Sequence, residues 1–167
     1  DPTTLDALVG ACGDEYWAVR AHAGRGVARI GGAKAVEALI VLFNDSIMDV
    51  RNDVVAAMAS MGAVVVDRLI AALKDERWRV REHAAKTCGE IKDRKAVEAL
   101  MFVCRDRDGA VKSAVAEALG KIGDPRAIPA LSKLFRDPSK TVRETAGTAL
   151  ISIGQPSVDP LIECLKD

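Results

Sequence analysis

The sequence predicts an all-α fold, a right-handed α-solenoid (an α-α superhelix) of about five helix pairs plus a final helix. Three observations support this prediction: an aspartate that recurs at a nearly constant interval, apolar residues at helical spacing around it, and a glycine that ends most units. Apolar residues make up 49% of the chain and aromatic residues only 4%. Small aliphatic side chains give thin packing layers, which favour helix packed on helix.

The recurring aspartate precedes an apolar run in every unit. The five aspartates are Asp14, Asp45, Asp75, Asp106 and Asp137, and Asp167 continues the series. Successive members are separated by either thirty or thirty-one positions. Because it lies just ahead of a predicted helix, this aspartate is expected to be an N-cap or a turn residue.

A helix is predicted directly after each aspartate. Apolar residues occupy the fifth, ninth, thirteenth and sixteenth positions beyond it, as Val19, Ala23, Val27 and Ile30 do in the first unit. Steps of four, four and three place them on one helix face. The following residue is glycine in four units and Lys92 in the third. Glycine takes the left-handed conformation at little cost, so the helix is expected to end there.

A second helix is predicted before each aspartate, where apolar residues occupy the ninth, sixth and second positions upstream, as in Leu5, Leu8 and Cys12. The chain is therefore expected to form a single repeat domain over residues 1–167, without strands. The units are roughly 2–31, 32–62, 63–92, 93–123 and 124–154, plus a terminal helix over 156–167.

The repeated motif D-x-x-x-x-V-R, followed by A-x-x-A-L-G-x-I-G-D-P, resembles HEAT repeats. The best example is DRDGAVKSAVAEALGKIGDPRAIPALSKLFRD, from Asp106 to Asp137. With Trp78 at the third position after Asp75, the motif resembles the short type of HEAT repeat named after phycobilisome (PBS) lyases. Two departures are Lys112 in place of arginine and the missing Gly-Asp-Pro turn of the second unit. The resemblance implies that the Val-Arg helices line a concave face and that the preceding helices form a convex one.

Charge and composition exclude several classes of protein. The 24 basic and 24 acidic residues balance, which argues against general binding of nucleic acid or of a membrane surface. No apolar run approaches the roughly 20 residues needed to span a bilayer, and no signal peptide is visible. The four cysteines form no CxxC pair. We therefore expect a cytoplasmic and monomeric protein, with an end-to-end contact through the last helix as the alternative.

Each aspartate is accompanied by a cation at the sixth position after it. These pairs are expected to form a structural ladder of Asp14, Arg20, Asp45, Arg51, Asp75, Arg81, Asp106, Lys112, Asp137 and Arg143. Each cation can reach a carboxylate in its own or the next unit. We therefore favour a role in holding the stack together over a role in binding an anionic partner.

The histidines and cysteines do not indicate a metal site. His22 and His83 lie at the eighth position after the aspartate in the first and third units. Deoxyhypusine hydroxylases, which have HEAT-like repeats, hold a di-iron centre with His-Glu pairs near this position. Here, helices about 8–10 Å apart would separate the two rings by about 20 Å. We expect no metal and no cofactor, histidines on the concave surface, and core positions for Cys12, Cys88, Cys104 and Cys164.

The third, fourth, seventh, eighth, eleventh and fifteenth positions after each aspartate vary strongly from unit to unit. They carry tryptophan, methionine, histidine and mixed charges, a composition typical of a protein-binding patch. Partner contacts are predicted at Trp17, His22, Arg25, Met48, Asp49, Asn52, Trp78, Arg79, Glu82, His83, Lys86, Lys140 and Glu144. The alternative is that the tryptophan rings only cover the turns between helices.

The sequence favours a non-catalytic protein–protein interaction scaffold or adaptor that binds another protein on its concave face. No nucleophile lies beside a plausible base and no glycine-rich phosphate loop is present, so no catalytic residue and no enzyme activity are predicted. The resemblance leaves two alternatives open. One is a phycobilin lyase-type enzyme or lyase subunit. The other is a nucleic-acid binder similar to the HEAT-like DNA glycosylases, which the zero net charge disfavours.

Overall fold

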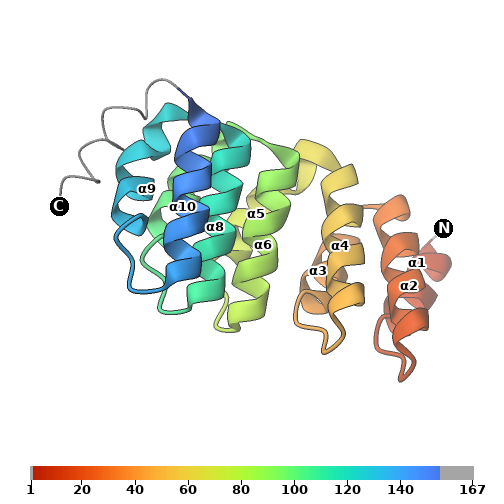
Figure 1. Cartoon of the computed structure of the whole chain (residues 1–167). Helices are drawn as coiled ribbons and strands as arrows, with labels where there is room; N and C mark the ends of the chain where they lie inside the picture. Colours follow the sequence, from red (N-terminus) through yellow and green to blue (C-terminus); the bar gives the residue numbers. More distant parts are fainter. Residues whose placement is uncertain (1, 155–167) are drawn as a thin grey trace.

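The computed structural model describes residues 2–154 as two rows of helices stacked side by side (Figure 1). The first two units contain α1 (Pro2–Ala11), α2 (Trp17–Ile30), α3 (Ala33–Leu42) and α4 (Met48–Ser60). The next three contain α5 (Val66–Ala72), α6 (Trp78–Ile91), α7 (Val97–Val103), α8 (Gly109–Ile122), α9 (Ile128–Leu134) and α10 (Lys140–Ile153). Residues 2–154 contain no strand, so the predicted all-α solenoid is confirmed. The predicted terminal helix over 156–167 lies outside the described residues.

The helix ends follow the sequence pattern. Glycines with a positive φ follow the second helices: 76° at Gly31, 69° at Gly62, 70° at Gly123 and 87° at Gly154. Lys92 takes the same place in the third unit with a φ of 59°, the left-handed conformation that usually favours glycine. The prediction that the helix ends at this position is confirmed.

The recurring aspartate is a turn residue. In each unit its Oδ1 accepts a hydrogen bond from the backbone N–H of the second residue after it, at 2.8 Å for Asp14 and 2.9 Å for Asp45. The N-cap residues are Tyr16, Ile47 and their equivalents, which lie beyond the aspartate. The alternative that the aspartate is a turn residue is confirmed. The alternative that it is the N-cap is wrong, because a residue further along the chain caps the helix.

The helices α5, α7 and α9 are each preceded by a short 3₁₀ turn. In the last two cases an aspartate caps this turn: Asp93 accepts from the N–H of Lys95, and Asp124 accepts from the N–H of Arg126. The side chain of Arg126 also donates to Asp124, and together these bonds lower the pKa of that carboxyl to about 2. The turn Gly62–Val65 lacks such a cap. The connection from the second unit to the third therefore lacks the capping bond that the next two connections have.

The core runs between the two rows. The valine at the fifth position after the aspartate is fully buried in the second to fifth units, at Val50, Val80, Val111 and Val142. Cys88 and Cys104 are also buried, which confirms their assignment to the core, and burial raises the pKa of both thiols to about 12. Cys12 is partly buried against the core, and Cys164 lies outside residues 2–154.

The inner row consists of α2, α4, α6, α8 and α10. These helices pack directly against one another, whereas the helices of the other row make few contacts with one another. The closest approaches lie in the last three units. A Cβ added at Gly89 would lie 2.8 Å from the Cα of Ala118, and one added at Gly120 would lie 2.8 Å from the Cα of Ala149. Only glycine allows two helices to come this near.

Within residues 2–154, no single helix has both the length and the apolar character of a membrane span. The pair Met48–Ser60 and Gly62–Ala72 has both together but is bent by 115° at the break between its two parts.

Candidate protein-interaction surface

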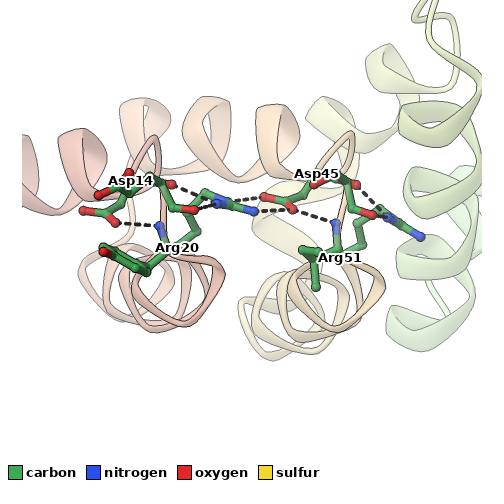
Figure 2. Close-up of polar contacts among 8 residues, drawn as sticks. Asp14, Arg20, Asp45 and Arg51 are labelled. Atoms are coloured by element: carbon green, nitrogen blue, oxygen red, sulfur yellow. Dashed lines mark hydrogen bonds and ion pairs between the residues drawn. The ribbon is translucent and has the colours of Figure 1, made fainter.

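Arg20, the first cation of the ladder, holds two units at once. The Nη1 of Arg20 donates to the carbonyls of Asp14 and Glu15 at 2.8 and 3.0 Å. Its Nε and Nη2 donate to both carboxylate oxygens of Asp45, in the next unit, at 2.6 and 2.8 Å (Figure 2). One side of the guanidinium thus fixes its own turn, and the other side binds the following unit.

The same arrangement recurs in the later units. Arg81 binds the carboxylate of Asp106 at 2.6 and 2.9 Å, and Lys112 binds that of Asp137. Burial opposes ionisation of Asp106, but the hydrogen bonds from Arg81 and from a backbone N–H outweigh it, so its pKa lies below the ordinary value. A buried, bidentate arginine–carboxylate pair is strong because both groups are held in a fixed geometry.

The ladder is interrupted between the second and third units. Arg51 donates through Nη1 to the carbonyls of Asp45 and Ser46, as its equivalents do. Its Nε is buried and has no partner within residues 2–154. The expected carboxylate, Asp75, is instead bound by Nε and Nη2 of Arg77, both at 2.9 Å. The hydrogen bonds from Arg77 hold the pKa of Asp75 below its usual value.

Larger side chains separate the helices at this junction. The fourth, eighth and twelfth positions after the aspartate lie on one helix face, and Gly89 meets Ala118 there. In the fourth unit these positions are Ala110, Ala114 and Ala118; in the third they are Arg79, His83 and Thr87. The contact of α6 with α4 is accordingly looser than its contact with α8, as Figure 1 shows.

His83 is not a surface residue, so its predicted place on the concave surface is wrong. Its side chain is 1% exposed and stacks on the ring of Phe43, with the ring centres 6.0 Å apart. Burial lowers the pKa of His83, which favours the neutral imidazole. Nδ1 donates to the carbonyl of Arg79 at 2.7 Å, and Nε2 has no partner among the described residues. The ring is therefore part of the junction with the second unit.

Large apolar side chains are exposed where the first three inner helices begin. In the first unit they are Tyr16 and Trp17, and in the second Ile47 and Met48. Trp78 continues this apolar row in the third unit, with 38% of its surface exposed. The row stops there, because Gly109 and Lys140 take the same position in the last two units.

Trp78 is flanked by a cation on its own helix. The guanidinium carbon of Arg79 lies 4.8 Å from the centre of the Trp78 ring, a cation–π contact. Arg79 forms no ion pair with any described residue, and its Nε is buried without a partner. Trp78 and Arg79 therefore form an aromatic surface beside a positive charge that no described residue neutralises by an ion pair.

Most other charges on the inner surface are neutralised by neighbours. Arg25 binds Asp53 across the first junction. Lys121 binds Glu90 at 2.7 Å and also Glu117. A hollow of about 360 Å³ lies beside these groups, lined by α4 residues Asn52, Val55, Ala56 and Ala59 together with Lys86, Glu90, Glu117 and Lys121. The inner surface therefore combines paired charges with an open groove next to the loose junction.

The predicted contact residues fall into three groups. The exposed group is Trp17, His22, Arg25, Met48, Asn52, Asp49, Trp78, Lys140 and Glu144. The partly buried group is Arg79, Glu82 and Lys86, and the buried one is His83. Trp17, Met48 and Trp78 are the first residues of the successive inner helices α2, α4 and α6, whereas Lys140 and Glu144 lie on the last inner helix, α10. The contacts themselves remain a prediction.

Sequence reasoning missed Tyr16, Ile47 and Arg77. All three occupy the second position after the aspartate, which the other two units fill with Asp108 and Ser139. The variation at this position, and the second arginine that occurs there only in the third unit, were the available signals. Within residues 2–154, no group of three histidine, cysteine or acidic side chains could hold a metal ion.

A family model of HEAT repeats matches residues 66–151 and 103–167, and together these spans cover more than half of the chain. The chain belongs to the HEAT-repeat family. A search of curated proteins gives no match.

Several solved structures share the HEAT-type fold. The complex of CpcE and CpcF of phycocyanin lyase from Nostoc sp. PCC7120 is 24% identical, with a TM-score of 0.63 over 98% of this chain and 70% of that chain. An engineered protein is 21% identical, with a TM-score of 0.58 over 97% and 85% of the two chains. Human deoxyhypusine hydroxylase in complex with glycerol is 19% identical, with a TM-score of 0.56 over 92% and 74%. These likenesses show a common fold.

Proposed function

We propose that this HEAT-repeat chain is a non-catalytic scaffold that binds a partner protein along the apolar row of its first three inner helices. The observation that carries the proposal is the exposure of Trp17 (49%), Met48 (61%) and Trp78 (38%) along one edge. Contiguous exposed apolar side chains on a folded protein mark interaction sites. Tryptophan and arginine, as in Trp78 and Arg79, are also the residues most enriched among those that dominate binding energy.

The restriction of this row to three units supports an interaction role. Turn packing alone would call for a large side chain in every unit, yet Gly109 replaces it in the fourth unit and the array continues without it. This restriction supports a role for the row other than holding the stack together. A partner with apolar side chains spaced to match successive inner helices, about 8–10 Å apart, would fit it.

The test is a double substitution, Trp78→Ala with Arg79→Ala, assayed by quantitative capture of the partner. We expect capture to fall by about 30-fold, because a residue of this class contributes about 2 kcal/mol or more. Phe102→Ala is the matched control, since Phe102 is 70% exposed but lies on the outer helix α7. Unchanged capture with the double variant, or an equal loss with the control, would reject this site. Circular dichroism checks that all variants fold.

A further inference from the structure

The unpaired side of Arg51 has a defined chemical preference. Its equivalents Arg20 and Arg81 use the same atoms, Nε and Nη2, to bind two carboxylate oxygens at 2.6 to 2.9 Å. Arg51 repeats their bonds to the carbonyls of its own turn, so its guanidinium is held in the same way. Figure 2 shows this side of Arg51 directed away from its own unit, and its buried Nε has no partner among the described residues. The repeat itself indicates that the side is shaped for a carboxylate.

The carboxylate that would complete this link within the chain is occupied. Asp75 is bound by both Nε and Nη2 of Arg77 and also accepts the backbone N–H of Arg77. Two arginines therefore compete for one carboxylate at this junction, and Arg77 holds it. At the equivalent junctions Asp45 and Asp106 have no such competitor, because Ile47 and Asp108 take the place of Arg77.

The carboxylates near Arg51 are engaged by other cations: Asp45, whose pKa Arg51 helps to lower, is bound by Arg20 at 2.6 Å. Arg79 lies on α6 one turn before His83, which senses the charge of Arg51. Arg79 has no ion pair among the described residues, and the nearby carboxylate of Glu82 is bound to Lys86 at 2.7 Å. Neither Arg51 on α4 nor Arg79 on α6 thus forms an ion pair with a described residue, and the fully buried His83 has an unpartnered Nε2 at the same junction. Partly buried cations without counter-ions favour an anionic ligand.

We propose that the unpaired side of Arg51 binds a carboxylate of the partner protein, from an aspartate or glutamate side chain that enters between the second and third units. This inference rests on the proposed scaffold function and names the chemistry of its partner. Trp78 and Met48 lie on the units that flank the site, so the acidic residue is accompanied by apolar neighbours. The partner segment combines one acidic side chain with apolar side chains on either side.

The test uses nuclear magnetic resonance of the arginine Nε–H groups in the whole chain. The probe is acetyl-Leu-Glu-Leu-amide, and its matched control is acetyl-Leu-Gln-Leu-amide. We expect the glutamate peptide to shift the Nε–H signal of Arg51 saturably and to bind about tenfold or more tightly than the glutamine peptide. Equal binding of the two peptides, or no shift at millimolar concentrations, would overturn the proposal. Inorganic phosphate is titrated in parallel, and tighter binding of phosphate at Arg51 would also overturn it.

Variants separate the site from a general charge effect. Arg51→Lys keeps the charge, as Lys112 does naturally, but removes the two-pronged side, so it should weaken binding of the glutamate peptide, followed by the backbone amide signals of α4 and α6. Arg29→Gln changes the net charge elsewhere on the inner row and should leave the response unchanged. Arg77→Gln releases Asp75 to occupy Arg51 and should weaken peptide binding about tenfold. Adding Asp75→Asn to Arg77→Gln should restore it, and a failure of this rescue contradicts the mechanism.

The peptide titration and the partner-capture experiment can each fail without the other failing. If the double Trp78 and Arg79 substitution leaves capture intact while the peptide still binds Arg51, the apolar row is rejected and the carboxylate site stands. If capture depends on Trp78 but the peptides do not distinguish glutamate from glutamine, the carboxylate site is rejected and the scaffold stands. Thermal unfolding of each variant confirms that it is folded before either conclusion is drawn.

Discussion

The junction between the second and third units differs from the two junctions that follow it, although all are built from the same repeat. Between α6, α8 and α10, glycine meets alanine and an aspartate accepts the preceding cation. Between α4 and α6, Ala59 takes the place of the glycine, and Arg79, His83 and Thr87 take the place of small residues. A few variable positions therefore decide whether two units lock together or remain separable.

The largest expected effect is the loss of stability on removing Arg81, at a tight junction, compared with removing its equivalent Arg51, at the loose junction. Arg81→Ala leaves Asp106 without its partner in a site where both side chains are only 9% exposed, and should lower the free energy of unfolding by about 3–5 kcal/mol. Arg51→Ala removes only hydrogen bonds to backbone carbonyls and should cost about 1–2 kcal/mol. Urea unfolding followed by circular dichroism measures both. Equal losses would show that the ladder is not interrupted at Arg51.

A smaller effect is expected from adding one methyl group at the tight junction. The Cβ of Gly120→Ala would lie 2.8 Å from both the Cα and the Cβ of Ala149, so α8 and α10 must move apart. Overpacking should exceed the gain in helix propensity and lower the free energy of unfolding by about 1–2 kcal/mol. Gly26→Ala is the control, because its Cβ would meet only the flexible side chain of Leu8, at 3.1 Å. A stabilised Gly120→Ala variant would contradict the close approach.

The smallest effect is a pH dependence located at the loose junction. Burial lowers the pKa of His83, while Glu82, Lys86 and Arg51 exert weaker and partly cancelling effects. The unfolded chain takes up this proton near pH 6.5 and the folded chain only at lower pH. The contribution of His83 to stability is therefore complete above pH 6.5 and is lost as the pH falls below it.

Unfolding at a series of pH values tests this behaviour. His83→Phe keeps an aromatic ring against Phe43 but cannot titrate, so the loss of stability between pH 7 and pH 5 should become shallower. His22→Phe, at the equivalent exposed position, should retain the slope of the natural sequence. An unchanged slope in His83→Phe would assign the pH dependence to other groups.

The sequence predicts the fold and the helix ends because both depend on local, repeated chemistry. The valine, the closing glycine and the aspartate recur at fixed positions, and each acts within its own unit. The burial of His83 could not be predicted in the same way. It depends on Phe43, in the preceding unit of the chain, and on how far α4 and α6 stand apart. Periodicity identifies the face of a helix that enters the core, but not what its flank meets in the neighbouring unit.

The interruption at Arg51 was partly visible in the sequence. Arg77 is the only arginine found at the second position after a recurring aspartate, and a guanidinium at that distance can compete for the carboxylate. Which of the two arginines wins depends on the separation of the units, and that separation follows from the bulk of Arg79 and His83. The competition is a three-dimensional property, so the sequence indicated the competitor but not the result.

Where the ladder is continuous, as at Arg20 and Arg81, each guanidinium joins only its own turn and the turn that comes next. A whole unit inserted or deleted between two others therefore restores the same set of bonds at the new boundary, provided that the cation and the aspartate are kept. The chain can change its length in steps of one whole unit without any redesign of the remaining ones. Gene duplication can thus extend or shorten such an array while every surviving neighbour keeps its hydrogen bonds.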